Sequence, residues 1–179
     1  MVRILLSPPF YYSPYTYRPR VDTGSPDNYW MEQALAQARL AAQRGEVPVG
    51  AVVVDPHGRL LAYDHNRKEA LSDPTAHAEM GALRLAARAR GSSWYLDGCT
   101  LYSSLEPCAM CYGAAVQARI ARIVYGAPEP KFGALGSTVD LSSIPFNHRI
   151  DVVAAVRSHE AAELMRAFFK LRRTDTALD

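Results

Sequence analysis

The sequence lacks a long apolar run, carries little net charge and contains few cysteines. Its 179 residues include 20 lysines and arginines against 18 aspartates and glutamates, which gives a formal net charge of +2 at pH 7. No apolar segment approaches the roughly 20 residues that a membrane helix needs. The near-neutral charge gives no reason, from composition alone, to expect a nucleic-acid partner. Because 49% of the residues are hydrophobic, we expect a soluble globular protein with one domain and no membrane association.

Three cysteines cannot all pair in disulfides, and two of them are close in the sequence. Cys108 and Cys111 lie one helical turn apart, which suggests thiolate ligands for a metal in a reducing compartment. The apolar opening of the chain stops at Ser7-Pro8-Pro9, short of a secretory core. We therefore expect a cytoplasmic protein.

Residues 1–26 differ in composition from the rest of the chain. They hold five of the twelve prolines and four tyrosines, and proline is excluded from helix interiors and central strands. We expect a flexible or surface-draped N-terminal extension over residues 1–26, followed by a single domain over residues 27–179. A Tyr/Pro docking strip for a partner is the alternative interpretation of the extension.

Helical and strand patterns alternate through the domain. Helices are predicted over residues 27–44, 73–90, 107–119 and 158–173, and strands over residues 47–54, 60–63, 100–104, 120–126 and 151–156. Asp73-Pro74 is typical of an N-cap followed by proline at the first helical position. The alternation predicts a layered α/β fold around a central, partly parallel sheet.

Two short motifs together suggest a metal site. His77-Ala78-Glu79 and Pro107-Cys108-Ala109-Met110-Cys111 each lie at the start of a predicted helix. Alone, the histidine is typical of a packed residue and the cysteine pair of a redox motif. Together they offer three ligands for tetrahedral zinc and leave the fourth position open, as catalytic zinc sites do. Cys99 is a possible fourth ligand, but its place at the start of a strand favours a buried thiol.

Glu79 is the candidate proton carrier beside this metal. Two thiolates and an imidazole neutralise the zinc charge and acidify its water less than three histidines would, so a neighbouring base is needed. On an ideal helix, however, positions 77 and 79 lie about 200° apart. The helical wheel alone therefore does not direct His77 and Glu79 to one point.

These motifs are similar to the H-x-E…P-C-x-x-C signature of zinc deaminases. Between about residues 27 and 173 the chain resembles the bacterial tRNA-specific adenosine deaminases, a branch of the zinc-dependent cytidine and deoxycytidylate deaminase superfamily. The segments that carry the resemblance are residues 46–51, 73–79, 105–111, 131–137, 146–149 and 168–173. It implies a cytidine-deaminase-like three-layer sandwich, with a central mixed five-stranded sheet flanked by helices.

The resemblance also implies a reaction, namely hydrolytic deamination of adenosine to inosine at the wobble position of a tRNA anticodon. One zinc ion per subunit would activate water, and Glu79 would carry the proton. The implied site residues are the zinc ligands His77, Cys108 and Cys111, the nucleoside-binding Asn66, the base-contacting Ala78 N–H and the pocket residue Val49. Without the resemblance, Asn66 is typical of a turn residue.

RNA contact and dimer formation are further expectations from the resemblance. Arg166 to Arg173 contains four basic residues with two phenylalanines between them, a pattern that suits phosphate contact and stacking or simply a solvated helix face. The candidate RNA contacts are Lys131, Arg149, Phe168, Phe169, Lys170, Arg172 and Arg173. The tRNA anticodon stem-loop and a second copy of the chain are the expected partners. Ala114, Ala115 and Ala118 fit either close helix approach in a homodimer or burial against the sheet.

Two other functions compete with this interpretation. A deaminase of free guanine or cytosine would share the zinc core, but it would need no basic aromatic tail and no extended surface at residues 131–137. A catalytically inactive RNA-binding protein with structural zinc would not need Glu79, which is intact here.

Overall fold

The computed structural model of the chain describes residues 26–91 and 93–175. A five-stranded mixed sheet has the strand order β2-β1-β3-β4-β5. β1 pairs antiparallel with β2 and β3, whereas β3, β4 and β5 run parallel. The strands are β1 (Gly50–Val54), β2 (Leu60–His65), β3 (Thr100–Leu105), β4 (Arg122–Ala127) and β5 (Asp151–Val153). The predicted mixed sheet is confirmed.

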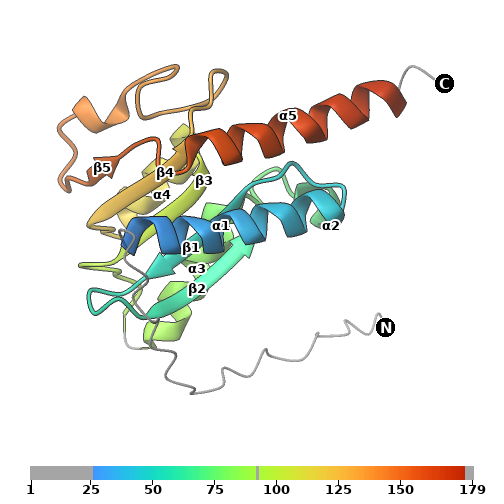
Figure 1. Cartoon of the computed structure of the whole chain (residues 1–179). Helices are drawn as coiled ribbons and strands as arrows, with labels where there is room; N and C mark the ends of the chain where they lie inside the picture. Colours follow the sequence, from blue (N-terminus) through green and yellow to red (C-terminus); the bar gives the residue numbers. More distant parts are fainter. Residues whose placement is uncertain (1–25, 92, 176–179) are drawn as a thin grey trace, which may run out of the picture.

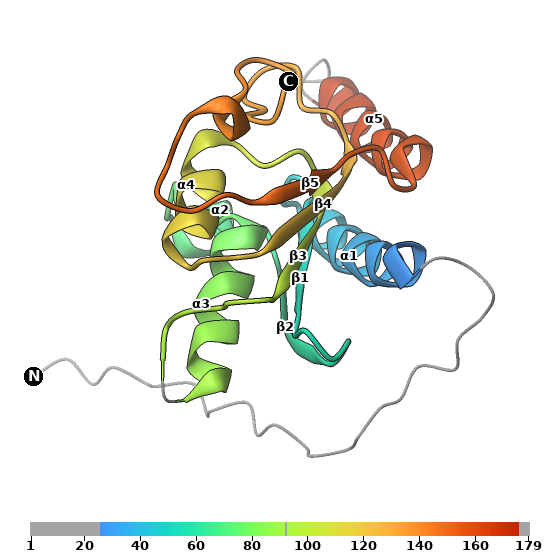
Figure 2. The ribbon, with the colours of Figure 1, turned by 90° about the vertical axis from the view of Figure 1, so that its left-hand side faces the viewer.

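Helices cover both faces of this sheet, as the views of Figures 1 and 2 show. α1 (Pro26–Gln43) and α5 (Ser158–Asp175) lie on one face, and α3 (Ala78–Arg90) and α4 (Ala109–Gln117) lie on the other. The short α2 (Lys68–Leu71) and the 3-10 helix η1 (Leu141–Ser143) lie in connections. Each face has its own buried hydrophobic cluster. The three-layer architecture is therefore confirmed.

α1 shows how sequence pattern becomes packing. Trp30, Met31, Ala34 and Leu35 are buried on one face of the helix, at the spacing of an amphipathic helix. At Gly50 the helix backbone comes so close to β1 that a Cβ atom would lie 2.2 Å from the Ala34 carbonyl oxygen. Glycine is therefore required where α1 crosses the first strand.

Several predicted boundaries are wrong, and the largest shift is at α3. This helix begins at Ala78 and not at Asp73. Asp73 is not its N-cap, because the Asp73 carboxylate instead accepts the Thr75 N–H and hydroxyl within a preceding turn. α4 also begins two residues later than predicted, at Ala109, and β1 begins at Gly50.

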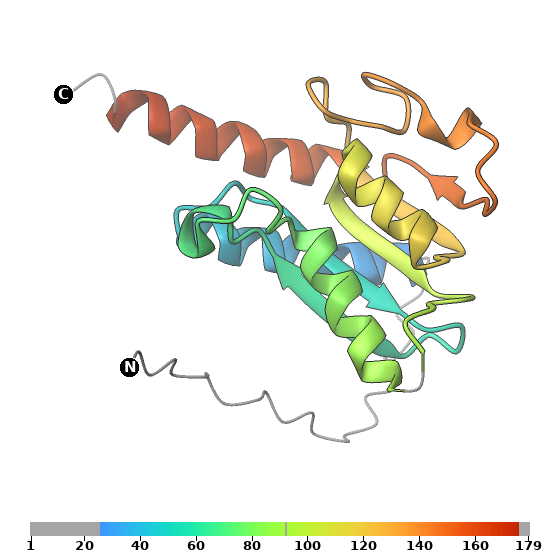
Figure 3. The ribbon, with the colours of Figure 1, turned by 180° about the vertical axis from the view of Figure 1, so that it is seen from behind.

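The N-terminal boundary differs by one residue from the prediction. Pro26 is the first residue of α1, where its missing N–H is no loss. Residues 1–25 of the predicted extension lie outside the described residues. None of the helices in the described ranges combines the length and apolar character that a membrane crossing requires. At the other end of the chain, α5 extends well past the edge of the sheet (Figure 3).

Candidate metal centre and active site

The first and second candidate ligands occupy equivalent positions at the starts of two helices. His77 is the N-cap of α3 and Cys108 is the N-cap of α4, and both have extended backbone dihedral angles, with φ of −75° in each case. Neither side chain forms a capping hydrogen bond, so both are available to a metal. Cys111 lies one turn further along α4 and is fully buried.

The three ligand atoms converge at distances that fit zinc. His77 Nδ1 lies 3.8 Å from Cys108 Sγ and 3.6 Å from Cys111 Sγ, and the two sulfur atoms are 3.7 Å apart. Tetrahedral zinc with bonds of about 2.3 Å to sulfur and about 2.0 Å to nitrogen separates its ligand atoms by roughly 3.5–3.8 Å. In the described part of the chain this is the only such group of three potential ligands. The donor set and its spacing therefore fit one zinc ion.

The ionisation of the two cysteines is coupled. The hydrogen bond between the two cysteine sulfur atoms, together with the nearby His77 and against the effect of burial, lowers the pKa of Cys108 to about 4. The same hydrogen bond and burial raise the pKa of Cys111, and the bond to Cys108 raises the pKa of His77. The site thus has a stable thiolate at Cys108, which is the form that binds metal.

Glu79 lies in the first turn of α3, next to these ligands. Its side chain is only 3% exposed, and Oε1 accepts a hydrogen bond of 3.2 Å from the Ser103 hydroxyl on β3. Oε2 is the one buried side-chain polar atom of the described residues with no hydrogen-bond partner. Burial raises the pKa of Glu79 above its ordinary value. A buried carboxyl oxygen without a partner beside a metal site is suited to exchange a proton there.

The N-cap position of His77 resolves the conflict with the helical wheel. Because His77 lies outside α3 in an extended conformation, the angle of about 200° between positions 77 and 79 of an ideal helix does not apply. The two side chains leave the backbone from different conformations. His77 and Glu79 can therefore serve one site although only one residue separates them.

Asn66 holds the start of α3 against the start of β1. Its Oδ1 accepts the Ala78 N–H at 2.9 Å, and its Nδ2 donates to the Val47 carbonyl at 3.1 Å. The Asn66 N–H donates to the carbonyl of Val49, whose side chain is buried in the core. The Ala78 N–H, implied to contact the base, is thus bound to Asn66 in this structure. Asn66 follows β2 directly, as a turn residue would. Its buried side chain also connects the start of α3 to the segment before β1, and we call this pair of bonds the Asn66 clamp.

Two buried glutamates that the sequence interpretation did not single out fix the loops beside the site. Glu106 accepts hydrogen bonds from the N–H groups of Glu129, Leu135 and Ser137 and from the Ser137 hydroxyl. Glu46 accepts the N–H groups at the start of α2. Glu106 directly precedes Pro107-Cys108, and this adjacency to the cysteine motif was the signal available in the sequence.

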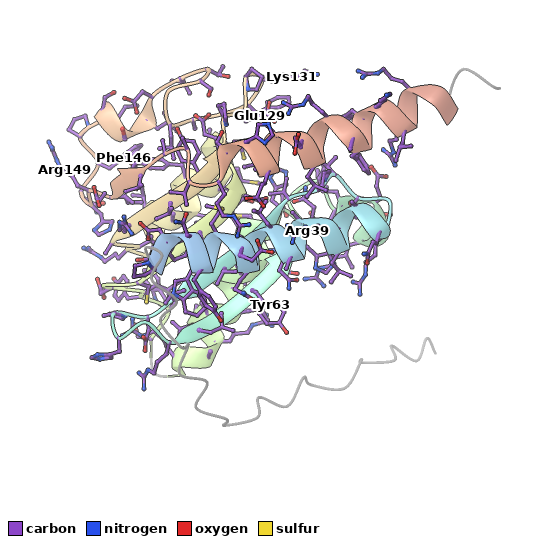
Figure 4. All side chains as sticks on the ribbon, viewed as in Figure 1. Arg39, Tyr63, Glu129, Lys131, Phe146 and Arg149 are labelled. Atoms are coloured by element: carbon purple, nitrogen blue, oxygen red, sulfur yellow. The ribbon has the colours of Figure 1, made fainter. Side chains whose placement is uncertain are left out.

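The structure does not gather all of the candidate RNA contacts. Lys131 and Arg149 are exposed but well separated (Figure 4). Phe169 is 41% exposed, whereas Phe168 is buried under the Arg172 guanidinium, whose carbon lies 5.2 Å from the ring centroid. Phe168 therefore presents no stacking face, which corrects its inclusion among the RNA contacts. Lys170, Arg172 and Arg173 lie on the exposed end of α5.

Cys99 is separate from the metal site, as expected. It is fully buried, and its Sγ lies 3.6 Å from a guanidinium nitrogen of Arg90. Of the three alanines considered for close helix approach, Ala115 is fully buried and belongs to the core, while Ala114 and Ala118 are half-buried. Burial against the sheet thus explains Ala115.

Known proteins resemble this chain in both sequence and structure. The family model of the cytidine and deoxycytidylate deaminase zinc-binding region matches residues 25–127. A tRNA-specific adenosine deaminase of Agrobacterium fabrum is 46% identical over 148 residues, which are 82% of this chain and 96% of that protein. A solved structure from work on A-to-I editing by tRNA:A34 deaminases at the wobble position has a TM-score of 0.73 and 46% identity, and the match covers 76% of this chain and 98% of that one.

A further relative is much longer than this chain. A tRNA(Ile)-lysidine synthase of Deinococcus deserti is 51% identical over 140 residues, which are 78% of this chain. The matched region is 26% of that protein, so this chain spans about a quarter of its length.

Proposed function

The chain belongs to the cytidine and deoxycytidylate deaminase family, whose zinc-binding region it contains, and on that premise we propose that it converts adenosine to inosine at the wobble position of tRNA. The reaction adds water to the adenine ring at C6 and releases ammonia. The observation that carries the proposal is the convergence of His77, Cys108 and Cys111 beside the unpartnered Glu79 Oε2. The similarity to adenosine deaminases acting on tRNA supports the substrate.

In this mechanism His77 Nδ1 and the sulfur atoms of Cys108 and Cys111 hold the metal. When bound there, zinc would supply a water molecule with a lowered pKa for the addition. Glu79 moves protons, because its Oε2 accepts a proton without first breaking a hydrogen bond. The Ser103 hydroxyl fixes the other oxygen, so the carboxyl group keeps one orientation while it passes a proton to the ring and then to the leaving ammonia.

Asn66 and Val49 are the proposed nucleoside contacts, and the Ala78 N–H would join them only by sharing the hydrogen that it donates to Asn66. Asn66 Oδ1 already accepts the Ala78 N–H, but a carbonyl oxygen has a second lone pair and the Nδ2 group has a second hydrogen. The Asn66 clamp therefore has one acceptor and one donor position left for a substrate. This arrangement gives Asn66 a binding role that does not require its structural bonds to break.

A tRNA anticodon stem-loop requires a cationic surface beside the site. We assign this role to the exposed residues Lys131, Arg149, Phe169, Lys170, Arg172 and Arg173, which offer phosphate contact and one stacking ring. The net charge of +2 is no objection, because basic residues are concentrated at one end of α5. The wide separation of Arg149 from α5 (Figure 4) suits a folded RNA more than a free base.

Assembly, location and domain organisation complete the proposal. The chain acts as a homodimer in the cytoplasm, with residues 27–179 as the catalytic domain and residues 1–26 as an extension. Half-buried Ala114 and Ala118 leave room for close approach of another surface. Sedimentation equilibrium tests the dimer directly, and a monomeric mass at micromolar concentration would contradict it.

The test of the reaction uses zinc-loaded protein and an anticodon stem-loop with adenosine at the wobble position. We expect inosine, detected by sequencing as an adenosine-to-guanosine change, and no change in a stem-loop with the adenosine elsewhere in the loop. Failure to form inosine would contradict the proposal. Faster turnover of free guanine or cytosine than of the stem-loop would favour the small-substrate alternative, and zinc-dependent RNA binding without turnover would favour the inactive one.

A further inference from the structure

An aromatic side chain with no packing role stands next to the metal ligands. Phe132, between β4 and η1, is 71% exposed, more than any other large hydrophobic residue in the described ranges. Single apolar side chains are common on protein surfaces, so exposure alone implies nothing. The loop around Phe132, however, is rigid and lies beside the metal ligands. These two features make the exposed ring a candidate contact for a ligand.

The loop is held from inside by the carboxylate of Glu106. That carboxylate accepts the N–H groups of Glu129, Leu135 and Ser137 at 3.0, 2.8 and 3.1 Å. Glu129 precedes Phe132 in the chain, and Leu135 and Ser137 follow it, so the loop is held on both sides of the ring. The hydrogen bonds from Ser137 and from these N–H groups, acting against burial, hold the pKa of Glu106 below its ordinary value, so the carboxylate stays charged and its bonds stay strong at neutral pH.

The backbone immediately around Phe132 is also constrained. The N–H groups of Lys131 and Gly133 donate to Glu129 at 2.9 Å each, and the two prolines at positions 128 and 130 fix φ just before the ring. The conformational entropy of this segment is therefore already reduced before any ligand arrives. A rigid loop that presents an apolar ring is suited to binding.

The loop is attached to the metal site itself. Gly133 forms a β-bridge with the zinc ligand Cys108, and the Ala134 N–H donates to the Pro107 carbonyl at 2.9 Å. A Cβ atom on Gly133 would lie 2.5 Å from Glu106, so this position faces the protein interior. Phe132 is its neighbour in the chain and faces solvent, at the rim of the site and not within it.

We propose that Phe132 is a positioning residue that stacks on an unpaired base next to the target adenosine. The inference rests on the proposed function, because a free nucleobase has no neighbouring base to stack. An unpaired base matches the ring in shape and polarity. Lys131, which precedes Phe132 in the chain, is exposed (Figure 4) and can contact a phosphate of the same RNA. Phe132 makes no ring contact within the described residues, so the stacking face is free.

The experiment compares variants on stem-loops with and without the neighbouring bases. Steady-state kinetics are measured for the wild type, Phe132→Ala, Phe132→Leu and Phe132→Trp on the intact stem-loop and on two stem-loops with an abasic site directly 5′ or 3′ of the target. Loss of one stacked base corresponds to about a ten-fold change. We expect KM to rise about ten-fold for Phe132→Ala and Phe132→Leu with kcat nearly unchanged, and Phe132→Trp to retain the wild-type KM.

On one of the two abasic stem-loops, the wild type and Phe132→Ala should become equal, because the stacking partner is gone. A second readout is the fluorescence of 2-aminopurine at that same position in the RNA. We expect binding to the wild type to quench it and binding to Phe132→Ala to leave it brighter. This measurement does not depend on turnover.

The matched control is Trp94→Ala. Trp94 is also an exposed aromatic residue, at 58%. It lies before the start of β3 in the chain, whereas Cys108 lies after the end of that strand. Equal KM values for Phe132→Ala and Trp94→Ala on intact RNA, or an equal loss for Phe132→Ala on all three stem-loops, would overturn the proposal. If the wild type forms no inosine, the proposed function fails. Quenching of 2-aminopurine by Phe132→Ala to the same extent as by the wild type would reject the stacking independently of turnover.

Discussion

At the scale of single residues, the site depends on two N-cap positions and one buried carboxyl group. His77 and Cys108 have the extended dihedral angles of residues that precede a helix, which directs their side chains away from the first turn. Glu79 lies inside α3 and is held by Ser103. The proton carrier and the ligands thus come from different backbone conformations and need no shared helical face.

The first prediction concerns Glu79→Gln. The amide keeps the size of the side chain but cannot carry a proton, so we expect kcat for inosine formation to fall by about 10²–10⁴-fold. Zinc content and RNA affinity should stay within two-fold of the wild type. Glu163→Gln, a change on the exposed surface of α5, is the matched control, and activity of Glu79→Gln above a tenth of that control would refute the assigned role.

The second prediction concerns the cysteines. Cys108→Ser removes the thiolate with the lowered pKa, and we expect the zinc content to fall from one ion per chain to a small fraction of that, as measured by elemental analysis after dialysis. Cys99→Ala should keep its zinc, because Cys99 is buried away from the ligand group. Equal zinc loss in both variants would indicate general unfolding and not ligand removal.

At the scale of elements, two buried glutamates connect the sheet to the loops that border the site. Glu106 at the end of β3 holds the segment from Glu129 to Ser137, and Glu46 before β1 holds the start of α2. Each carboxylate accepts hydrogen bonds from loop N–H groups, in place of the backbone carbonyl partners that regular secondary structure would supply. These loops are therefore ordered by the core and not by regular secondary structure.

The third prediction tests the Glu106 clamp. In Glu106→Gln one oxygen is replaced by an NH₂ group that faces donors, so we expect the free energy of unfolding to fall by about 2 kcal/mol. Hydrogen exchange should become faster at Leu135 and Ser137, and the KM for RNA should rise. Glu69→Gln on the surface is the control. Unchanged exchange at those two amides would show that the carboxylate does not order the loop.

At the scale of the whole molecule, ion pairs connect elements that are far apart in the sequence. Arg122 on β4 donates two hydrogen bonds, of 2.7 and 2.9 Å, to the Asp27 carboxylate at the start of α1. The Tyr102 hydroxyl on β3 donates a third, of 2.9 Å. The Arg122 hydrogen bond holds the pKa of Asp27 below its ordinary value. One carboxylate thus ties the first helix to two strands.

The fourth prediction is the pH dependence of this contact. Because the folded protein lowers the pKa of Asp27, its stabilising contribution is complete above the unfolded pKa of about 3.9 and is lost as the pH falls through the folded value. We expect Asp27→Asn to lower the free energy of unfolding by about 1 kcal/mol at pH 7.

Urea unfolding at a series of pH values measures this difference. The curves of the wild type and Asp27→Asn should converge as the pH falls below about 4. Asp97→Asn is the control for a general effect of removing a carboxylate. A stability difference for Asp27→Asn that is constant from pH 7 to pH 3 would exclude the ionic contribution.

Much of this protein was determined by the order of its residues. The pattern of apolar positions predicts the helix that became α1 and the alternation of helices and strands around a mixed sheet, because burial periodicity is a local property. The motifs at His77 and at Cys108-x-x-Cys111 identify the ligand set, because the type and spacing of metal donors are chemical features that can be read directly in the sequence. The resemblance to zinc deaminases depended on these same residues.

Tertiary structure decided what local pattern does not specify. A helical wheel places His77 and Glu79 far apart because it treats both residues as helical, and only the fold shows that α3 begins after His77. The clamps formed by Glu46 and Glu106, and the place of the Phe132 loop beside Cys108, all depend on residues more than 20 positions apart. Contacts over such separations form only when the chain packs into its layers, so no local pattern in the sequence predicts them.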